Sequence, residues 1–167
     1  MPGLTAPPDD IDPVGEVIEA DGWFPAIATD HVRKSVRLGE GIVTDERLKA
    51  AIFSGMLTAL RELADWRSAR AAEGVADLSS VVAPHLGEIS IAALLWQRIV
   101  TFYAAAEIVD GHTDVSATDE ALDREEDKVD QADRYRRKAY DAVADLRALG
   151  LPVDAPRPHG RNRVSLI

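Results

Sequence analysis

ISIAALLWQRIVTFYAAAEIV, residues 89–109, is the stretch that decides the fold. Its apolar residues recur at helical spacing along two sides. One side holds Ile91, Leu95, Ile99, Phe102, Ala106 and Val109, and Leu94, Trp96, Val100 and Tyr103 lie on the second. A helix that is apolar on so many sides is central to a bundle or faces another subunit. We therefore expect a central helix, with a subunit interface that includes Trp96, Val100 and Tyr103.

Two further long helices flank this stretch. Thr44 is a suitable N-cap for a helix that runs to about residue 73, where Gly74 stops it. The last helix is expected from about residue 118 to 149, with Gly150 and Pro152 as its stop. A short helix is expected over residues 30–38. The predicted fold class is all-α: a small helical bundle of three long helices plus a short N-terminal helix, which together make one helical domain over residues 23–150.

The two ends of the chain differ in charge. Residues 1–22 hold six acids, no Lys or Arg, and several prolines, which predicts a flexible acidic N-terminal arm. Residues 151–167 are predicted to form an extended C-terminal tail with Arg157, Arg161 and Arg163. The alternation over residues 163–167 would suit a short strand that adds to a sheet edge of another protein. Disorder without function remains the alternative for both ends.

The composition excludes several classes of function. The net charge of −10 opposes sequence-specific nucleic-acid binding, which normally uses a basic face. No cysteine is present, so disulfides and thiol chemistry are excluded. No histidine pair has metal-ligand spacing, and neither phosphate-binding glycine motifs nor a nucleophile elbow occurs. We therefore expect no catalytic residues, no metal, no cofactor, no secretion signal and no membrane span.

Two charged runs lie in the last predicted helix. The acids of residues 119–130 are interpreted as a solvated helix face, because nothing in the sequence supplies the pocket that carboxylate catalysis needs. A basic cluster follows, formed by Arg134, Arg136, Arg137 and Lys138. It is the best nucleic-acid candidate in the chain. Pairing within the helix to Asp130, Asp133 and Asp141 is the simpler interpretation.

An ordered set of short motifs resembles the head completion proteins of P2-like tailed bacteriophages. The set runs through most of the chain, from residue 23 to 109 and from 118 to 167. It comprises Trp23-Phe24-Pro25, Val32-Arg33, Arg37-Leu38, Arg47-Leu48, Ala51-Ile52, Ser54-Gly55-Met56, Glu62-Leu63, Trp66-Arg67, Ala72-x-Gly74, Arg98, Ala104-Ala105-Ala106, Val164-Ser165 and Ile167. None of these short motifs is specific to the family by itself. Their order along the chain and the pattern of residues at the C-terminus are specific to it.

The resemblance implies a non-enzymatic structural virion protein in the head–tail neck, made in the cytoplasm of the bacterial host. Such an adaptor would bind the phage portal protein after DNA packaging, as a ring of about twelve copies that matches the portal symmetry. It would stabilise the filled capsid and offer an attachment surface to a tail terminator or other neck protein. We expect the portal contact in the tail, at Arg157, Arg161, Arg163, Val164, Leu166 and Ile167.

A small cytoplasmic helical interaction or regulatory protein of a bacterium is the alternative. It would use the same bundle as a small dimer and would not recognise a portal. An enzyme with a carboxylate site outside the known motifs is a third class.

Overall fold

The computed structural model describes residues 15–36, 43–111 and 119–151, and for residues 119–128 only the path of the helix. The elements, in chain order, are β1 (Val17–Ile18), β2 (Ile27–Ala28), α1 (Thr29–Ser35), α2 (Asp45–Ala72), a 3₁₀ turn (Leu78–Ser80), β3 (His85–Leu86), β4 (Ile89–Ser90), α3 (Ile91–Asp110) and α4 (Asp119–Ala148). The four predicted helices are all present.

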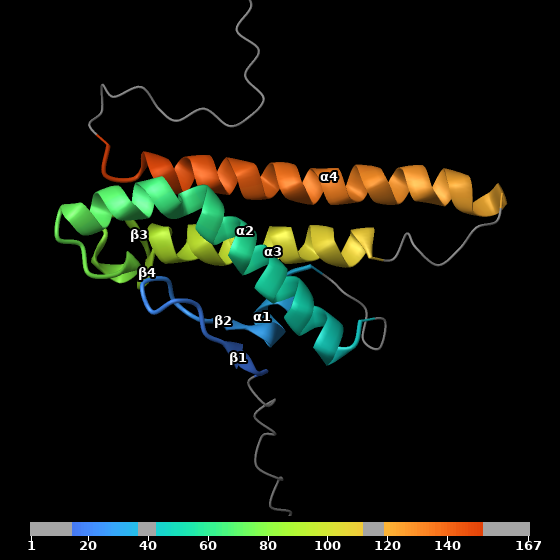
Figure 1. Cartoon of the computed structure of the whole chain (residues 1–167), viewed down its shortest axis with the longest axis horizontal. Coiled ribbons are helices and arrows are strands. Elements are labelled where there is room, and N and C mark those ends of the chain that lie inside the picture. Colours follow the sequence, from blue (N-terminus) through green and yellow to red (C-terminus); the bar gives the residue numbers. More distant parts are fainter. Residues whose placement is uncertain (1–14, 37–42, 112–118, 152–167) are drawn as a thin grey trace, which may run out of the picture.

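Helix α3 is the centre of the molecule. It packs along α4 on one side and against α2 on another, while α2 and α4 contact each other much less. Helix α4 runs alongside α3, whereas α2 crosses α3 at an angle (Figure 1). By length and composition α3 could also cross a membrane, but the core helix of a globular protein has the same character. Its packing between two helices explains why this helix is so apolar.

Local signals in the sequence set the starts of α2 and α3. The Thr44 side chain accepts a hydrogen bond of 3.4 Å from the Arg47 N–H, which confirms the predicted cap. At the start of α3 the Ser90 side chain accepts a hydrogen bond of 3.3 Å from the Ala92 N–H. Helix α2 ends at Ala72, where Gly74 follows with a φ of +88° that favours glycine.

Two small hairpins correct the all-α prediction. β1 pairs antiparallel with β2, and β3 pairs antiparallel with β4. In the first hairpin Ile18 pairs with Ile27, and both side chains are buried. The Thr29 N–H also donates to the Glu16 carbonyl at 2.9 Å. Residues 15–22 are therefore ordered, and the predicted flexible arm was too long at this end. Residues 1–14 lie outside the described part of the chain.

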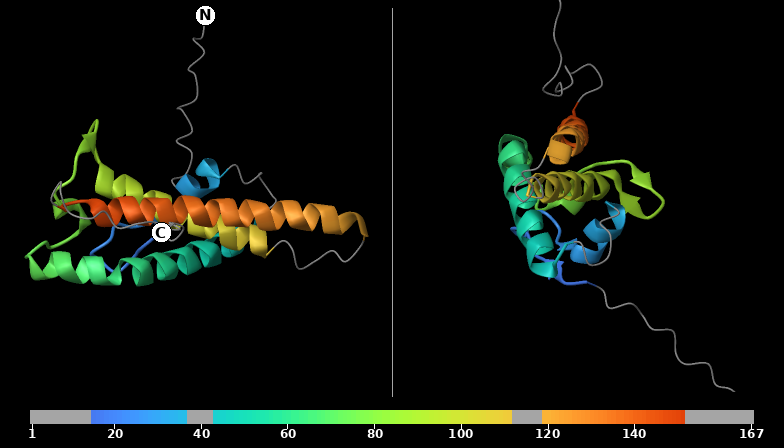
Figure 2. Two further views of the ribbon diagram at one scale, coloured as in Figure 1. Left: turned by 90° about the horizontal axis from the view of Figure 1, so that it is seen from above. Right: turned by 90° about the vertical axis from the view of Figure 1, so that its right-hand side faces the viewer.

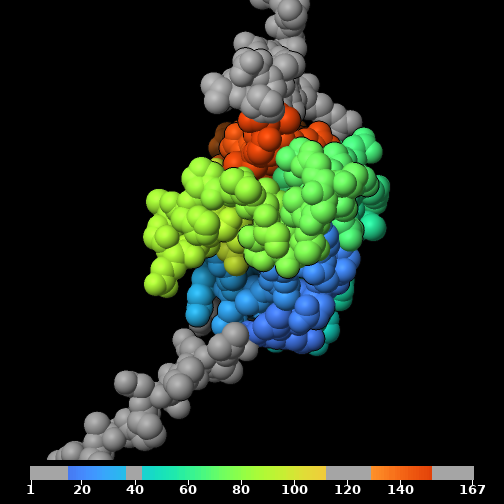
Figure 3. Space-filling model, turned by 90° about the vertical axis from the view of Figure 1, so that its left-hand side faces the viewer, coloured from blue at the N-terminus to red at the C-terminus, as the bar shows by residue number. Residues whose placement is uncertain are grey.

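The second hairpin projects from the body (yellow-green in Figure 3). Leu86 pairs with Ile89 across a turn that includes Gly87, whose φ is +64°. Both side chains are exposed, as is Val82 just before the hairpin. Leu78 is buried against the bundle, whereas Val82 is exposed.

An aromatic cluster closes one end of the core. Trp23 and Phe24 meet edge to face at 4.7 Å between ring centroids, and Trp23 contacts Trp66 in the same way at 5.8 Å. Asp21 fixes the turn that places them, because its carboxylate accepts from the N–H groups of both Trp23 and Phe24. Both aromatic side chains are buried, so they cap this end of the core.

Candidate interaction surfaces

The three residues predicted to form a subunit interface lie in the core of the chain itself. Trp96 and Val100 have no exposed surface, and Tyr103 is 5% exposed. The Trp96 ring stacks on Phe24 at 4.2 Å, and its Nε1–H donates to the Pro25 carbonyl at 2.9 Å. These side chains cannot reach another subunit while the chain is folded. The interface prediction was wrong at these positions, because burial within one chain accounts for their apolar character.

Part of the first apolar stripe of α3 reaches the surface, although Ile99 and Ala106 of that stripe are buried. Ile91, Leu95, Phe102 and Val109 are half-buried, and Arg98 in the same stripe is exposed. They recur at spacings of three, four and seven residues, so they share one face of the helix. The part of α3 that is available to other molecules therefore includes these five positions.

A group that we call the cation–aromatic cluster joins this stripe to α4. It consists of Arg98 and Phe102 from α3 and of Tyr135 and Lys138 from α4. The Phe102 and Tyr135 rings stack at 6.0 Å between centroids. The Arg98 guanidinium lies 5.3 Å and the Lys138 ammonium 5.2 Å from the Phe102 centroid. Such exposed cation–π contacts contribute about 0.5–1 kcal/mol each.

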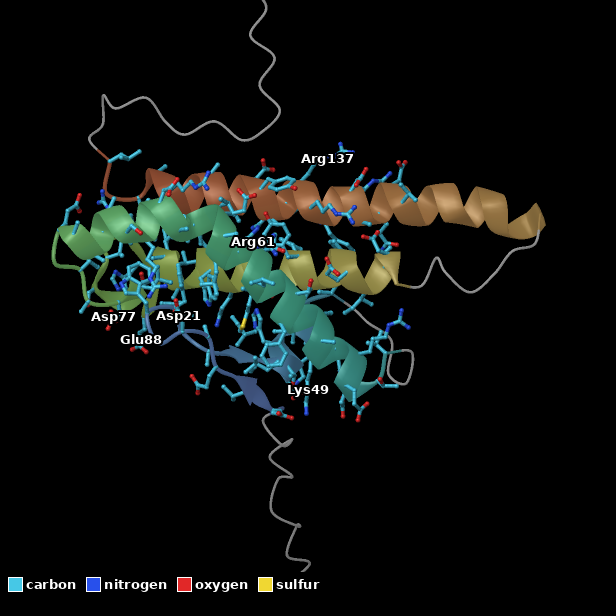
Figure 4. All side chains as sticks on the ribbon, viewed as in Figure 1. Asp21, Lys49, Arg61, Asp77, Glu88 and Arg137 are labelled. Carbon is cyan, nitrogen blue, oxygen red and sulfur yellow. The ribbon has the colours of Figure 1, made fainter. Side chains whose placement is uncertain are left out.

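Most of the basic cluster of α4 is not paired as predicted. Arg136 does pair with Asp133, at 2.9 Å, and also with Asp110 of α3. Arg134, Arg137 and Lys138 form no ion pair with any carboxylate whose side chain the structure describes. Arg137 points away from the body, on the side opposite to Asp21, Asp77 and Glu88 (Figure 4). On this outer side of α4 the exposed Arg134, Arg137 and Lys138 alternate with the exposed Asp130, Asp141 and Asp145, so the described part of the face carries mixed charge.

Exposed apolar side chains occur in two further places. Phe53 and Leu57, one turn apart on α2, are 57% and 54% exposed. Val82 and Leu86, at the second hairpin, are 88% and 70% exposed. Large apolar side chains this accessible, if grouped, mark contact surfaces more often than catalytic sites.

The titratable groups whose pKa is shifted have structural explanations. The hydroxyls of Ser79 and Ser80 donate to the Asp77 carboxylate and lower its pKa. The Glu16 carboxylate raises the pKa of Lys49 and ties the first hairpin to α2. Neither pair lies in a cluster of the kind that catalysis needs.

The other His, Asp and Glu side chains that the structure describes do not form a catalytic or metal-binding group either. Among residues 15–36, 43–111 and 129–151, no group of three His, Asp or Glu side chains could hold a metal ion. His31 and His85 are exposed on different elements. His112, His159 and the acids of 119–128 lie outside the described side chains. So do all six residues predicted to bind the portal, from Arg157 to Ile167.

Sequence reasoning missed the cation–aromatic cluster. One signal could have found it: Phe102 follows Arg98 by four residues, and Lys138 follows Tyr135 by three, so each pair shares a helix face. The second hairpin also had a signal, since Gly87-Glu88 separates two short apolar runs. The exposed apolar and charged side chains, together with the helical core, define the class: a small, mainly helical protein with exposed apolar side chains on α2 and on the second hairpin.

The comparisons with known proteins give the family. Residues 18–151 match the family described as Phage head completion protein (GPL). The head completion/stabilization protein of Escherichia phage P2 is 32% identical over 120 residues, which cover 71% of this chain and 70% of the relative. The chain therefore belongs to the head completion protein family of P2-like bacteriophages, and the resemblance in the sequence is confirmed. No solved structure matches it.

Proposed function

We propose that this chain is a structural virion protein of the head–tail neck that binds the portal after DNA packaging. It stabilises the filled capsid and provides the surface to which the tail attaches. The observation that carries this proposal is the family match, which spans nearly all of the described body. The name of the P2 relative, which joins head completion to stabilisation, supports the same role.

The portal contact is assigned to residues 157–167. This segment is rich in arginine and ends in apolar residues, in contrast to the acidic chain as a whole. A basic, alternating segment can add to a sheet edge through its backbone and pair its arginines with carboxylates. A ring of about twelve copies and a tail terminator or other neck protein complete the proposed partners.

A pull-down with the cognate portal protein tests the proposal. We expect the full chain to be retained and a variant that ends at residue 156 to be lost, while both give the same helical circular dichroism. The variant Arg61→Glu is the control for charge, since Arg61 is exposed on α2 and far from the tail in sequence. If the shortened chain bound as well as the full chain, the tail would not be the docking segment. If the full chain failed to bind, the portal role itself would be overturned.

A further inference from the structure

We infer that the cation–aromatic cluster is a docking site for an acidic segment of a second copy of this chain, residues 9–14. The inference adds a contact between copies to the proposed ring. It rests on the proposed function only for the assumption that copies of the chain assemble. It starts from an imbalance on the surface: the cations of the cluster meet aromatic rings, and no described carboxylate pairs with them.

Among the described residues only Arg98 and Lys138 combine a ring contact with the lack of a carboxylate partner, because Arg67, which lies over Trp23 and Phe24, also pairs with Asp21. Arginines and lysines that face the first hairpin or the ends of α3 have acidic or carbonyl partners. For example, Arg67 pairs with Asp21, and Arg47 donates to the Gly111 carbonyl. Arg98 and Lys138 instead flank the Phe102 ring, with Arg134 one turn away on α4. The site therefore offers positive charge beside a half-exposed aromatic surface.

The cluster faces away from α2. On the other flank of α4, Arg147 donates to the Glu62 carbonyl of α2, and Tyr140 meets Tyr103 in the core. Tyr135 and Lys138 lie on the opposite flank, where they meet the exposed stripe of α3. A segment that docks there would lie along the line where α3 and α4 meet, without displacing α2.

The chemistry of the site selects the occupant. Aspartates would pair with Arg98 and Lys138, and an apolar residue between them would pack on Phe102 and Tyr135. Residues 9–14 of this chain read Asp-Asp-Ile-Asp-Pro-Val, and residues 1–14 contain no Lys or Arg. Duplex DNA is the less suitable anion, because a chain with a net charge of −10 repels phosphate as a whole.

A second copy supplies this segment more readily than the same copy. The described chain begins at Gly15 beside β1, which lies on the opposite side of α3 from α4 (Figures 1 and 2). Asp12 and Asp9 precede Gly15 by three and six residues, and so reach only about 10 and 20 Å along an extended chain. Packed helix axes are about 8–10 Å apart, so two layers span about 16–20 Å, and the segment of the same copy would have to be almost fully extended to reach the cluster. A neighbouring copy is under no such restriction.

Photo-crosslinking tests which copy supplies the segment. Ile11 is replaced by p-benzoylphenylalanine in the full chain, and ¹⁴N- and ¹⁵N-labelled copies are mixed before illumination. We expect mixed-isotope crosslinks that join position 11 to peptides holding residues 98–102 or 134–138. Crosslinks only within one copy, or only to other surfaces such as the acidic start of α4, would overturn the inference.

A charge swap tests the chemistry. We expect Arg98→Glu with Lys138→Glu to weaken self-association in sedimentation by at least about tenfold, equivalent to one pKd unit. Asp9→Lys with Asp10→Lys should weaken it similarly, and the four changes together should restore it. The control is Arg61→Glu with Lys34→Glu, two exposed cations outside the cluster. Circular dichroism checks that each variant is folded. The site would be refuted if the first variant associated as strongly as the wild type, or if the four changes together did not restore association. A wild type that stays monomeric would refute it as well.

The same variants separate this inference from the portal role. Portal capture should survive Arg98→Glu with Lys138→Glu, because the tail is unchanged. If the full chain bound no portal yet self-associated through the cluster, the proposed function would fail and the contact between copies would stand. A gel shift with duplex DNA completes the set. Binding to DNA that depends on the cluster, with self-association unaltered, would overturn the inference in favour of a nucleic-acid site.

Discussion

Gly55 of α2 lies directly against Val100 of α3. A Cβ atom at residue 55 would be 3.0 Å from the Val100 carbonyl oxygen, and equally close to the Ala104 nitrogen. Glycine in a helix interior costs about 1 kcal/mol relative to alanine. The close approach of the two backbones, which a larger side chain would prevent, offsets that cost. The two helices cross at this point because residue 55 has no side chain.

We predict that Gly55→Leu destabilises the fold by about 1–3 kcal/mol, since it forces a bulky side chain between two backbones. Ala64→Leu is the matched control, because Ala64 is exposed on the same helix. Urea denaturation followed by circular dichroism measures both. Equal midpoints for the two variants would mean that α2 and α3 can separate without cost.

The buried tryptophans allow a second test. Trp96→Phe removes the hydrogen bond to the Pro25 carbonyl, whose net contribution to stability is about 0.5–1.5 kcal/mol. Trp66→Phe should cost less, because the Trp66 Nε1–H is buried with no hydrogen-bond partner among the residues described. Thermal denaturation of the two variants checks the order. The reverse order would show that ring size, and not the hydrogen bond, governs these sites.

Asp77 predicts a pH dependence. Hydrogen bonds from Ser79 and Ser80 lower its pKa in the folded chain. Its contribution to stability is therefore present above the unfolded pKa of about 3.9 and is lost as the pH falls through the lower folded pKa. We expect Asp77→Ala to be less stable than the wild type at pH 6, with the difference shrinking in strong acid. Urea midpoints over that range measure this effect, and a difference that grew on acidification would contradict it.

The second hairpin should contribute little to the stability of the isolated chain. Val82 and Leu86 are mostly exposed, so replacing both with serine should change the free energy of unfolding by less than about 0.5 kcal/mol each. Leu78→Ala, a few residues earlier in the buried 3₁₀ turn, should cost about 2–5 kcal/mol. A large loss of stability in the serine variant would place the hairpin in the core.

The helices were predictable because their signals are local. A polar cap, a repeating apolar stripe and a stop residue lie within each segment, so α2 was expected over residues 44–73 and spans Asp45–Ala72. The same holds for α3 and α4 to within two residues. The hairpins were missed because each strand has only two residues, which is too short for an alternating pattern to appear.

The surfaces were harder to predict, for two reasons. An apolar residue such as Trp96 gives the same signal whether its own chain or another subunit buries it. Charge spacing on a helix permits a pair but does not require it: Arg136 pairs with Asp133, whereas Arg137 forms no pair with Asp141. Which partner a cation takes depends on the neighbouring helix, and that information is not in the spacing.

The ends of the described chain lie on opposite sides of the body. Gly15 lies beside β1, and Leu151 follows α4 beyond α3 (Figure 1). Molecules held by the segments that continue from these two points would therefore be kept apart by the full depth of the helical stack. The helical stack therefore sets the separation of the two points of attachment, and a change in core packing alone would alter that separation.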